Sequence, residues 1–281
     1  MLSSSVPLEI IVVDNKSTDD SADYIAKKFP EIKLIQSGEN LGFAGANNVA
    51  LNLALNSGND YFFLLNQDAW VEQNTIENLI AVAERNKGFG ILSPMHLTAD
   101  KNYLDVGFRD YSLRRLKLKV NYVYEYLFFK KQEPISVRFV NAAAWLISRK
   151  CVEIVGGFDT ILFKHYGEDN NYCQRVLFHK LEIGVVPSET ICHDRADRVN
   201  KSLGENIGFS ITQGNILSSN LKRYTKILLR LLSVKKTVIG FKEMFFIINN
   251  FKKIYKSRKI NKMIGGGMEY ILKTNTQSSP Q

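Results

Sequence analysis

The chain has 281 residues, of which 45% are apolar and 23% charged, a balance that suits one large α/β domain with a smaller appendage. Its net charge of +9 is concentrated in residues 221–263, where thirteen Lys or Arg stand against one Glu, so the rest of the chain sums to −3. A body without excess positive charge argues against a nucleic-acid-binding protein.

Residues 8–93 predict strands that alternate with helices. Four short apolar runs are typical of buried strands: residues 8–13, 32–36, 61–66 and 89–93. Three helices are expected between them: residues 17–29, 42–55 and 72–86. This alternation predicts βαβ units and a parallel sheet.

The rest of the chain is less regular. We expect two more strands and two more helices: strands at 139–148 and 183–186, helices at 149–155 and 168–179. From residue 207 the pattern is helical and basic. The predicted domains are a catalytic body at 1–205, a basic helical extension at 206–273 and a disordered polar tail at 274–281. Three cysteines fit no zinc spacing, and we expect reduced thiols.

Polar side chains follow the apolar runs, where parallel sheets build their binding crevices. Asp14 can accept hydrogen bonds from a nucleobase N–H or a ribose hydroxyl. Asp68 can bind Mg²⁺ or Mn²⁺ with few other protein ligands when phosphate oxygens complete the shell. Simpler roles stay open for both segments, namely helix capping after Asp14 and turn formation around Asp68.

Two later features fit the same chemistry. Glu168 and Asp169 open a helix, where they complement its dipole, but paired carboxylates can also raise a pKa into the range of a general base. His193 follows a strand and is a metal-ligand candidate only together with Asp68. The small-residue segment 40–48 suits close approach of backbone to a ligand, although it is not a P-loop.

Five segments occur in a fixed order. They are IIVVDNKSTD, NLGFAGANN, FLLNQDA, GGFD with a following GED, and His193. Together they resemble family 2 glycosyltransferases with the GT-A fold, over residues 8–200. The second segment is most similar to the rhamnosyltransferase-type branch, which builds bacterial cell-surface polysaccharides. The resemblance implies a mostly parallel, Rossmann-like sheet flanked by helices, with the basic helical extension after it.

The resemblance also implies a function. The expected reaction is metal-dependent, inverting transfer of a sugar from a dTDP- or UDP-linked donor to a glycan or lipid-linked acceptor. By position, Asp169 would be the general base and Glu168 would orient or bind the acceptor, while Asp68 and His193 would bind Mg²⁺ or Mn²⁺. The residues expected to contact or flank the donor are Asp14, Asn15, Asn40, Gly42, Asn47, Asn48 and Asn66, the last standing where the family usually has an acidic residue.

One departure from the family pattern concerns the first strand. Family members begin with an extra strand and helix that form one wall of the nucleotide pocket, and about 30 residues of this pattern are absent before Leu8. We therefore expect an N-terminally truncated form with reduced activity or stability. This departure keeps a non-catalytic nucleotide- or glycan-binding remnant open as an alternative, and a nucleotidyltransferase is a second one.

The basic segment 221–263 leaves its partner open. It alternates Lys and Arg with Leu, Ile and Phe, which fits either a helical subdomain packed on the body or amphipathic helices on an anionic membrane surface. Residues 1–7 do not form a secretory signal, and no apolar run is long enough to predict a spanning helix. We expect a cytoplasmic protein with peripheral attachment to the inner face of the membrane as an option, and no nucleic-acid partner.

Overall fold

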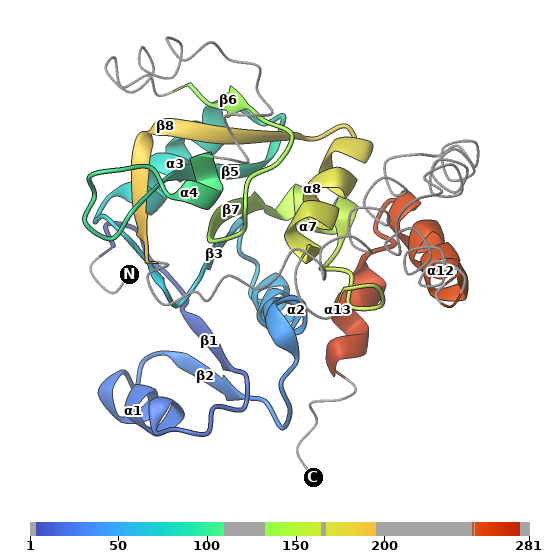
Figure 1. Cartoon of the computed structure of the whole chain (residues 1–281), viewed down its shortest axis with the longest axis horizontal. Coiled ribbons are helices and arrows are strands. Elements are labelled where there is room, and N and C mark those ends of the chain that lie inside the picture. Colours follow the sequence, from blue (N-terminus) through green and yellow to red (C-terminus); the bar gives the residue numbers. More distant parts are fainter. Residues whose placement is uncertain (1–3, 110–132, 164–166, 195–248, 250, 276–281) are drawn as a thin grey trace, which may run out of the picture.

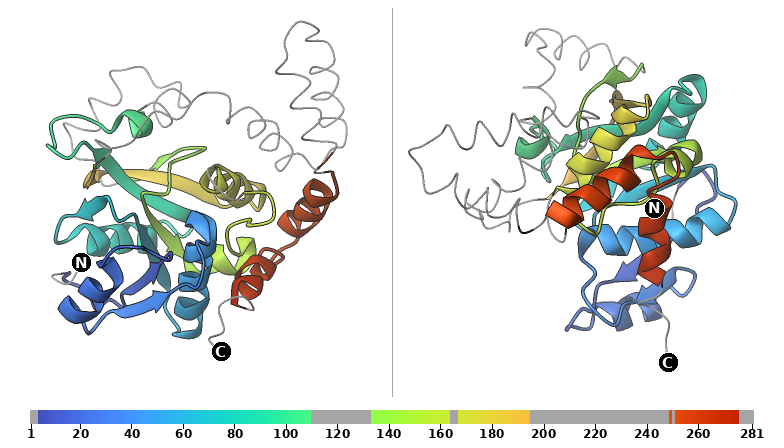
Figure 2. Two further views of the ribbon diagram at one scale, coloured as in Figure 1. Left: turned by 60° about the horizontal axis from the view of Figure 1, so that its bottom comes forward. Right: turned by 90° about the vertical axis from the view of Figure 1, so that its right-hand side faces the viewer.

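The structure is a computed structural model that describes residues 4–109, 133–163, 167–194, 249 and 251–275. The predicted helical segment between 206 and 248 and most of the predicted tail lie outside these residues. The described part forms a sheet with helices on both faces, and a smaller two-stranded sheet beside it (Figures 1 and 2).

The smaller sheet holds the first elements of the chain. Strand β1 (Ile11–Asp14) pairs in parallel with β2 (Lys33–Gln36), and helix α1 (Ser21–Lys28) connects them. All four residues of β1 are half-buried, and α1 has no buried residue. Within the described residues, β1 pairs only with β2, and no strand joins it to the larger sheet. The family's extra first strand is thus not among the described elements.

The larger sheet has six strands in the order β3-β7-β5-β8-β4, with β6 also paired to β8. The strand bounds are β3 Tyr61–Leu65, β4 Ala69–Val71, β5 Phe89–Leu97, β6 Ile135–Ser136, β7 Ala144–Ser148 and β8 Glu182–His193. Only β5 and β8 run parallel, whereas the other pairings in this sheet are antiparallel.

The α/β class and the flanked sheet are confirmed, but the larger sheet is mixed and not mostly parallel. Strand β7 lies between β3 and β5 and runs against both. Strand β4, at residues assigned to no element from the sequence, pairs antiparallel with β8. The apolar run of a strand that is buried on both faces is the same for a parallel and an antiparallel strand. The sequence could therefore not predict the direction of these strands.

Helices cover the two faces of this sheet. The helix bounds are α2 Gly42–Asn56, α3 Thr75–Arg85, α4 Val106–Phe108, α7 Arg149–Val155, α8 Glu168–Phe178, α12 Phe251–Lys262 and α13 Met268–Asn275. Alternate residues of β7 point to opposite faces: Trp145 and Ile147 join the core under α2, α7 and α8, whereas Leu146 joins the core under α3.

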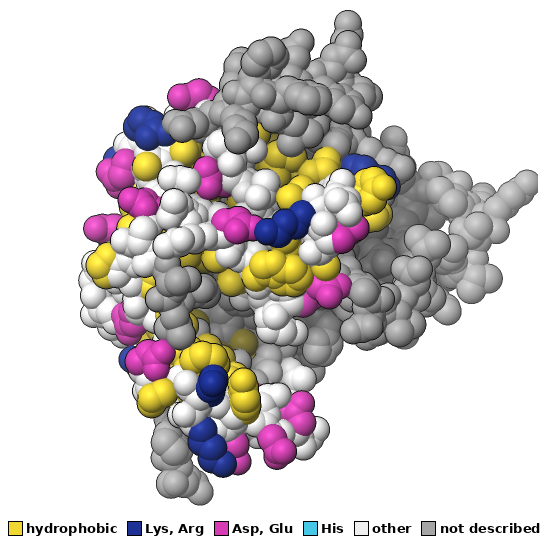
Figure 3. All heavy atoms as spheres, turned by 90° about the vertical axis from the view of Figure 1, so that its left-hand side faces the viewer, with side chains coloured by type: hydrophobic (Ala, Val, Ile, Leu, Met, Phe, Trp, Pro, Cys, Tyr) yellow, Lys and Arg dark blue, Asp and Glu magenta, His cyan; other side chains and the backbone are white. Residues whose placement is uncertain are grey.

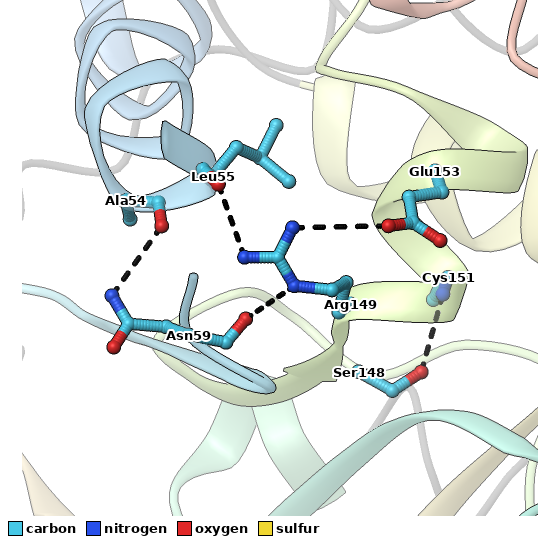
Figure 4. Close-up of polar contacts among 7 residues, drawn as sticks. All are labelled: Ala54, Leu55, Asn59, Ser148, Arg149, Cys151 and Glu153. Carbon is cyan, nitrogen blue, oxygen red and sulfur yellow. Dashed lines mark hydrogen bonds and ion pairs between the residues drawn. The ribbon is translucent and has the colours of Figure 1, made fainter. Parts of the chain in front are cut away.

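Arg149 connects the start of α7 to the end of α2 (Figure 4). Its guanidinium donates to the carbonyl oxygens of Asn59, at 2.6 Å, and Leu55, at 3.0 Å, and it lies over the ring of Phe62. Helix α7 begins after Ser148, whose hydroxyl accepts a hydrogen bond from the Cys151 N–H at 3.2 Å. The expected helix at 149–155 is therefore found with the same bounds, because both its cap and the glycine after it are local signals.

The surface of the body carries both signs of charge. On the face shown in Figure 3, acidic, basic and apolar side chains are interspersed. Among the described helices, none is long and apolar enough to cross a membrane.

Candidate active site

The antiparallel pairing of β4 with β8 brings Asp68 and His193 together. Ala69 is opposite His193 in this register, and the N–H of Asp194 donates to the carbonyl oxygen of Asp68 at 2.8 Å. The Oδ1 atom of Asp68 lies 3.3 Å from Nε2 of His193. The imidazole is fully buried, whereas the Asp68 side chain is 25% exposed. Residues 125 positions apart thus form one polar pair at a strand end.

A second carboxylate, Asp105, lies behind the imidazole. It precedes α4, is 3% exposed, and its Oδ2 is 4.0 Å from Nδ1 of His193. Its Oδ1 accepts the Phe108 N–H at 2.7 Å, which fixes the carboxylate in place. A carboxylate on the far nitrogen of an imidazole orients the ring and favours the tautomer whose free nitrogen points to a metal. Asp105 could not be predicted from the sequence, because this residue stands in an irregular segment with no strand end or motif to mark it.

The Asp68–His193 pair fits a divalent cation by spacing and chemistry. Carboxylate oxygen and imidazole nitrogen are ligands for Mn²⁺. Two neighbouring ligands at about 2.1 Å from an octahedral ion lie about 3 Å apart, close to the separation seen here. No group of three or more His, Cys, Asp or Glu that could hold a metal occurs among the described residues. A cation here would therefore need oxygen atoms from a ligand to complete its shell.

The predicted donor segments meet at the end of β1. Both carboxylate oxygens of Asp14 accept the Ser17 N–H, at 3.4 and 3.2 Å, in the segment between β1 and α1. The Asn15 side chain donates to the Gly42 carbonyl at 3.1 Å and accepts the Leu41 N–H at 3.0 Å. Asn40 accepts the Gly42 N–H at 2.9 Å. The turn after β1 and the start of α2 are therefore held together as one surface.

The two asparagines inside α2 have different surroundings. Asn47 is half-buried and donates to the Phe43 carbonyl one turn earlier, at 2.9 Å. Asn48 is fully buried, and its amide donates to the carbonyl of Phe158 at 2.9 Å and accepts its N–H at 2.7 Å. Asn48 thus holds the Gly156–Asp159 loop, and its burial removes it from the donor surface where the sequence predicted it. Asn66 begins the turn before β4, and its carbonyl accepts the Ala69 N–H at 3.1 Å.

The paired carboxylates open α8 as the sequence analysis predicted. Glu168 is 7% exposed, and burial, with the neighbouring charge of Asp169 second, raises its pKa from 4.5 to about 7. Asp169 is half-buried, and its Oδ1 accepts the Asn170 N–H at 2.6 Å. Near neutral pH the pair therefore has one group that can exchange a proton.

A short backbone segment connects α8 to the turn that carries Asp68. The Ala143 carbonyl accepts the Asn66 N–H at 2.9 Å, and the Val140 carbonyl accepts the thiol of Cys173, on α8, at 3.7 Å. The Cα atoms of Val140 and Ala143 can be at most about 11 Å apart. The turn that carries Asp68 and helix α8 are thus both hydrogen-bonded to the same buried segment, residues 140–143.

Comparisons with known proteins agree with this architecture. A dTDP-rhamnosyl transferase, RfbF, of Shigella flexneri is 24% identical over 255 residues, which cover 89% of this chain and 80% of that protein. An N-acetylglucosaminyl-diphospho-decaprenol L-rhamnosyltransferase of Mycobacterium tuberculosis is 26% identical over 102 residues, 34% of this chain and 33% of that protein.

A solved structure shares the fold. The crystal structure of GalNAc-T7 with UDP, GalNAc and Mn²⁺ matches 89% of this chain with a TM-score of 0.56 at 13% identity, and this chain spans about half (49%) of that one. The sequence model of Glycosyl transferase family 2 matches residues 4–153, more than half of the chain. The resemblance drawn from the five ordered segments is thereby confirmed: this chain belongs to glycosyl transferase family 2, and its relatives include rhamnosyltransferases.

Proposed function

We propose that this protein transfers a sugar of the rhamnose type from a dTDP-linked donor to a hydroxyl of a glycan or lipid-linked acceptor, with inversion at the anomeric carbon. The observation that carries the proposal is the Asp68–His193 pair at 3.3 Å, at the end of β8 in a family 2 fold. The names of the two relatives favour rhamnose over other sugars. We extend the proposal to cell-surface polysaccharide synthesis, because the NLGFAGANN segment resembles the branch of the family that builds such polysaccharides.

The donor side of the proposed reaction uses residues around β1 and β4. Asp14, half-buried at the end of β1, accepts hydrogen bonds from the base or ribose, while Asn15 holds the backbone of Leu41 and Gly42 against it. Asp68 and His193 would hold a divalent cation, with Asp105 orienting His193. Bound there, the cation supplies positive charge to the leaving diphosphate.

The acceptor side uses the start of α8. The acceptor oxygen attacks the anomeric carbon from the face opposite the diphosphate, so the new C–O bond forms as the old one breaks and the diphosphate leaves with the bonding electron pair. Asp169 takes the hydroxyl proton as general base. Glu168, with its pKa raised to about 7, binds the acceptor hydroxyls as donor or acceptor of hydrogen bonds.

The described part of the basic segment supports a peripheral membrane contact. Helix α12 packs on α8 and exposes Lys252, Lys253, Lys256 and Lys259. Met263 and Ile264 follow and are 55% and 79% exposed. We propose that this surface meets anionic lipid. Loss of co-sedimentation with anionic vesicles in Lys252→Glu/Lys256→Glu, but not in Lys27→Glu/Lys28→Glu on α1, is expected; equal binding by both would reject the contact.

A donor panel tests the proposed reaction. The protein is incubated with Mn²⁺ and dTDP-rhamnose, UDP-glucose or UDP-GlcNAc, with a panel of glycan and lipid-linked acceptors, and released nucleoside diphosphate is measured. We expect release from dTDP-rhamnose that EDTA abolishes, and an inverted anomeric centre in the product by NMR. Release that is faster from the UDP sugars would reject the rhamnosyl assignment. Cation-dependent dTDP binding without release would favour the non-catalytic alternative.

A further inference from the structure

The Gly156–Asp159 loop lies before α8 in the chain and is anchored twice. On one side, Asn48 of α2 holds the backbone of Phe158, whose ring is fully buried and packs against Trp145 and Tyr172. On the other side, the loop meets the residues from Ser257 to Tyr270, which we call the C-terminal clip. The clip comes from α12, α13 and the turn between them; α12 packs on α8, and α13 packs on α2 and α7 (Figures 1 and 2).

The first contact of the clip is with the carboxylate of Asp159, which is fully buried. Its Oδ2 accepts hydrogen bonds from the hydroxyl of Ser257 and from the amide of Asn261, the latter at 3.2 Å. Its Oδ1 accepts the N–H groups of Ile161 and Leu162, at 3.0 and 3.1 Å. A buried carboxylate is costly unless several donors satisfy it, so this site fixes the loop and α12 in one arrangement.

The same network reaches α8 and α13. The hydroxyl of Tyr270 donates to Oδ1 of Asn261 at 2.9 Å, and the backbone carbonyl of Asn261 lies 3.0 Å from Nε2 of His179, at the end of α8. Asn261 and Tyr270 are both buried. One polar network thus joins the loop before α8 to the residue after it.

Arg175 adds a second link from inside α8. Its side chain is fully buried, and its guanidinium donates to the carbonyl oxygens of Val155 at 3.0 Å and Gly157 at 2.7 Å. The guanidinium carbon lies 5.6 Å from the ring centre of Tyr270. A planar cation between the loop and the clip holds both in register with α8.

Backbone contacts close the arrangement. The Gly157 N–H donates to the Gly267 carbonyl at 3.0 Å, and the Gly265 N–H donates to the Ile154 carbonyl at 2.8 Å. A Cβ atom on Gly267 would lie 2.0 Å from the Val155 carbonyl oxygen, and one on Gly156, where φ is +79°, would lie 1.9 Å from Gly267. Only glycine on both sides permits this approach.

We propose that the C-terminal clip is a positioning element of the catalytic site: it holds the loop and α8 so that Glu168 and Asp169 face the acceptor. Ser257, Asn261 and Tyr270 are its positioning residues. The inference rests on the proposed function for its catalytic meaning. The hydrogen bonds of Ser257 and Asn261 join the clip to Asp159 and His179, whereas the Asp68–His193 pair is held by β4 and β8. Loosening the clip should therefore weaken transfer and spare nucleotide binding.

Matched tyrosine variants test this separation. Tyr270→Phe removes the hydroxyl that holds Asn261, and Tyr255→Phe makes the same change on a 66% exposed residue of α12. Ser257→Ala is a second clip variant. We expect kcat for sugar transfer to fall about tenfold in Tyr270→Phe and Ser257→Ala, because small misplacements of a catalytic group have large effects on rate. The affinity for dTDP with Mn²⁺ and the KM for the donor should stay unchanged, and Tyr255→Phe should match the wild type.

Three results would overturn the proposal. They are unchanged kcat in both clip variants, parallel loss of kcat and dTDP affinity, and equal effects of Tyr270→Phe and Tyr255→Phe. Amide hydrogen exchange separates this test from that of the function. If the wild type transfers no sugar, the proposed function fails, and faster exchange at residues 168–172 in the clip variants, with α3 unchanged, still supports positioning of α8 by the clip. Unchanged exchange at 168–172 overturns it.

Discussion

The β1–α1–β2 unit and the C-terminal clip flank the same body, yet they are held in opposite ways. The first unit has only half-buried strand residues in β1 and no buried residue in α1. The clip is built on a buried carboxylate, a buried arginine and glycine backbones in contact. Local stability follows buried contacts, so the first unit should open readily and the clip should not. From this difference we expect the β1–α1–β2 unit, on the nucleotide-binding side, to become ordered when the ligand binds. The acceptor side, which the clip holds, should be preformed.

Removing the charge of Asp68 should give the largest effect on the rate of sugar transfer. It should do so by changing the donor side of the site and not the clip. Asp68→Asn keeps the shape but loses the carboxylate beside His193, and we expect transfer to fall about 10³-fold, as for other losses of electrostatic stabilisation in a transition state. Asp100→Asn, which changes an exposed aspartate bonded to its own loop, is the control. The melting temperature should hardly change. Turnover within twofold of the wild type would remove Asp68 from the site.

Disturbing the close backbone contact between the clip and α7 should give the next largest effect. The quantity affected is the free energy of unfolding. Gly267→Ala places a Cβ against the Val155 carbonyl, and we expect a loss of about 3 kcal/mol in the free energy of unfolding. Gly38→Ala is the matched control, since nothing lies within 4 Å of its added Cβ. Urea denaturation measures both. Equal stability of the two variants would mean that the clip is not tightly docked.

The pH dependence of stability should isolate Glu168. Its pKa is raised from 4.5 to about 7 in the folded protein, so folding favours the protonated form and this contribution is lost as pH rises through 7. Glu168→Gln removes that loss, and we expect it to gain about 2 kcal/mol over the wild type between pH 5 and pH 8. The control is Glu31→Gln on an exposed position. A difference independent of pH would contradict the buried, protonated carboxyl.

The smallest effect is expected from a change at Asp105, next to the imidazole of His193, and it should be on metal affinity. Asp105→Asn can still accept the Phe108 N–H but loses the charge near Nδ1 of the imidazole. We expect Mn²⁺ to bind the dTDP complex about tenfold more weakly, with dTDP affinity in the absence of metal unchanged. Calorimetric titration of Mn²⁺ into the dTDP complex gives the first value, and titration of dTDP without metal gives the second. Unchanged metal affinity would mean that Asp105 caps α4 and does not orient His193.

Much of this fold could be predicted from local patterns. Helix α7 was found with the expected bounds because Ser148 and Gly156 mark its ends in the sequence. The family could also be predicted, because its motifs lie in a fixed order. The expected strand at 139–148 was too long at its start, since the structure begins β7 at Ala144. Apolar character reports burial, and residues 139–143 are buried without being in a strand.

The rest depended on contacts between distant residues. Asn48 looked like a donor-site residue from its motif, yet its partner Phe158 is 110 positions away. The roles of Ser257 and Tyr270 are equally invisible in a basic helical pattern, because neither residue is part of a motif. Asp105 became visible only through its distance from His193. The assignments of Asp14, Asp68, Asp169, Glu168 and His193 to steps of the reaction stay predictions.

The central claim is that Asp68 and His193 hold a divalent cation together with the diphosphate of the donor. The most direct measurement is a calorimetric titration of dTDP into the wild-type protein and Asp68→Asn, each with and without Mn²⁺. We expect Mn²⁺ to tighten dTDP binding at least about tenfold in the wild type, because the protein offers two ligands and the diphosphate must supply others. In Asp68→Asn the metal should have no effect. Equal dTDP affinity with and without Mn²⁺ in the wild type would contradict the claim.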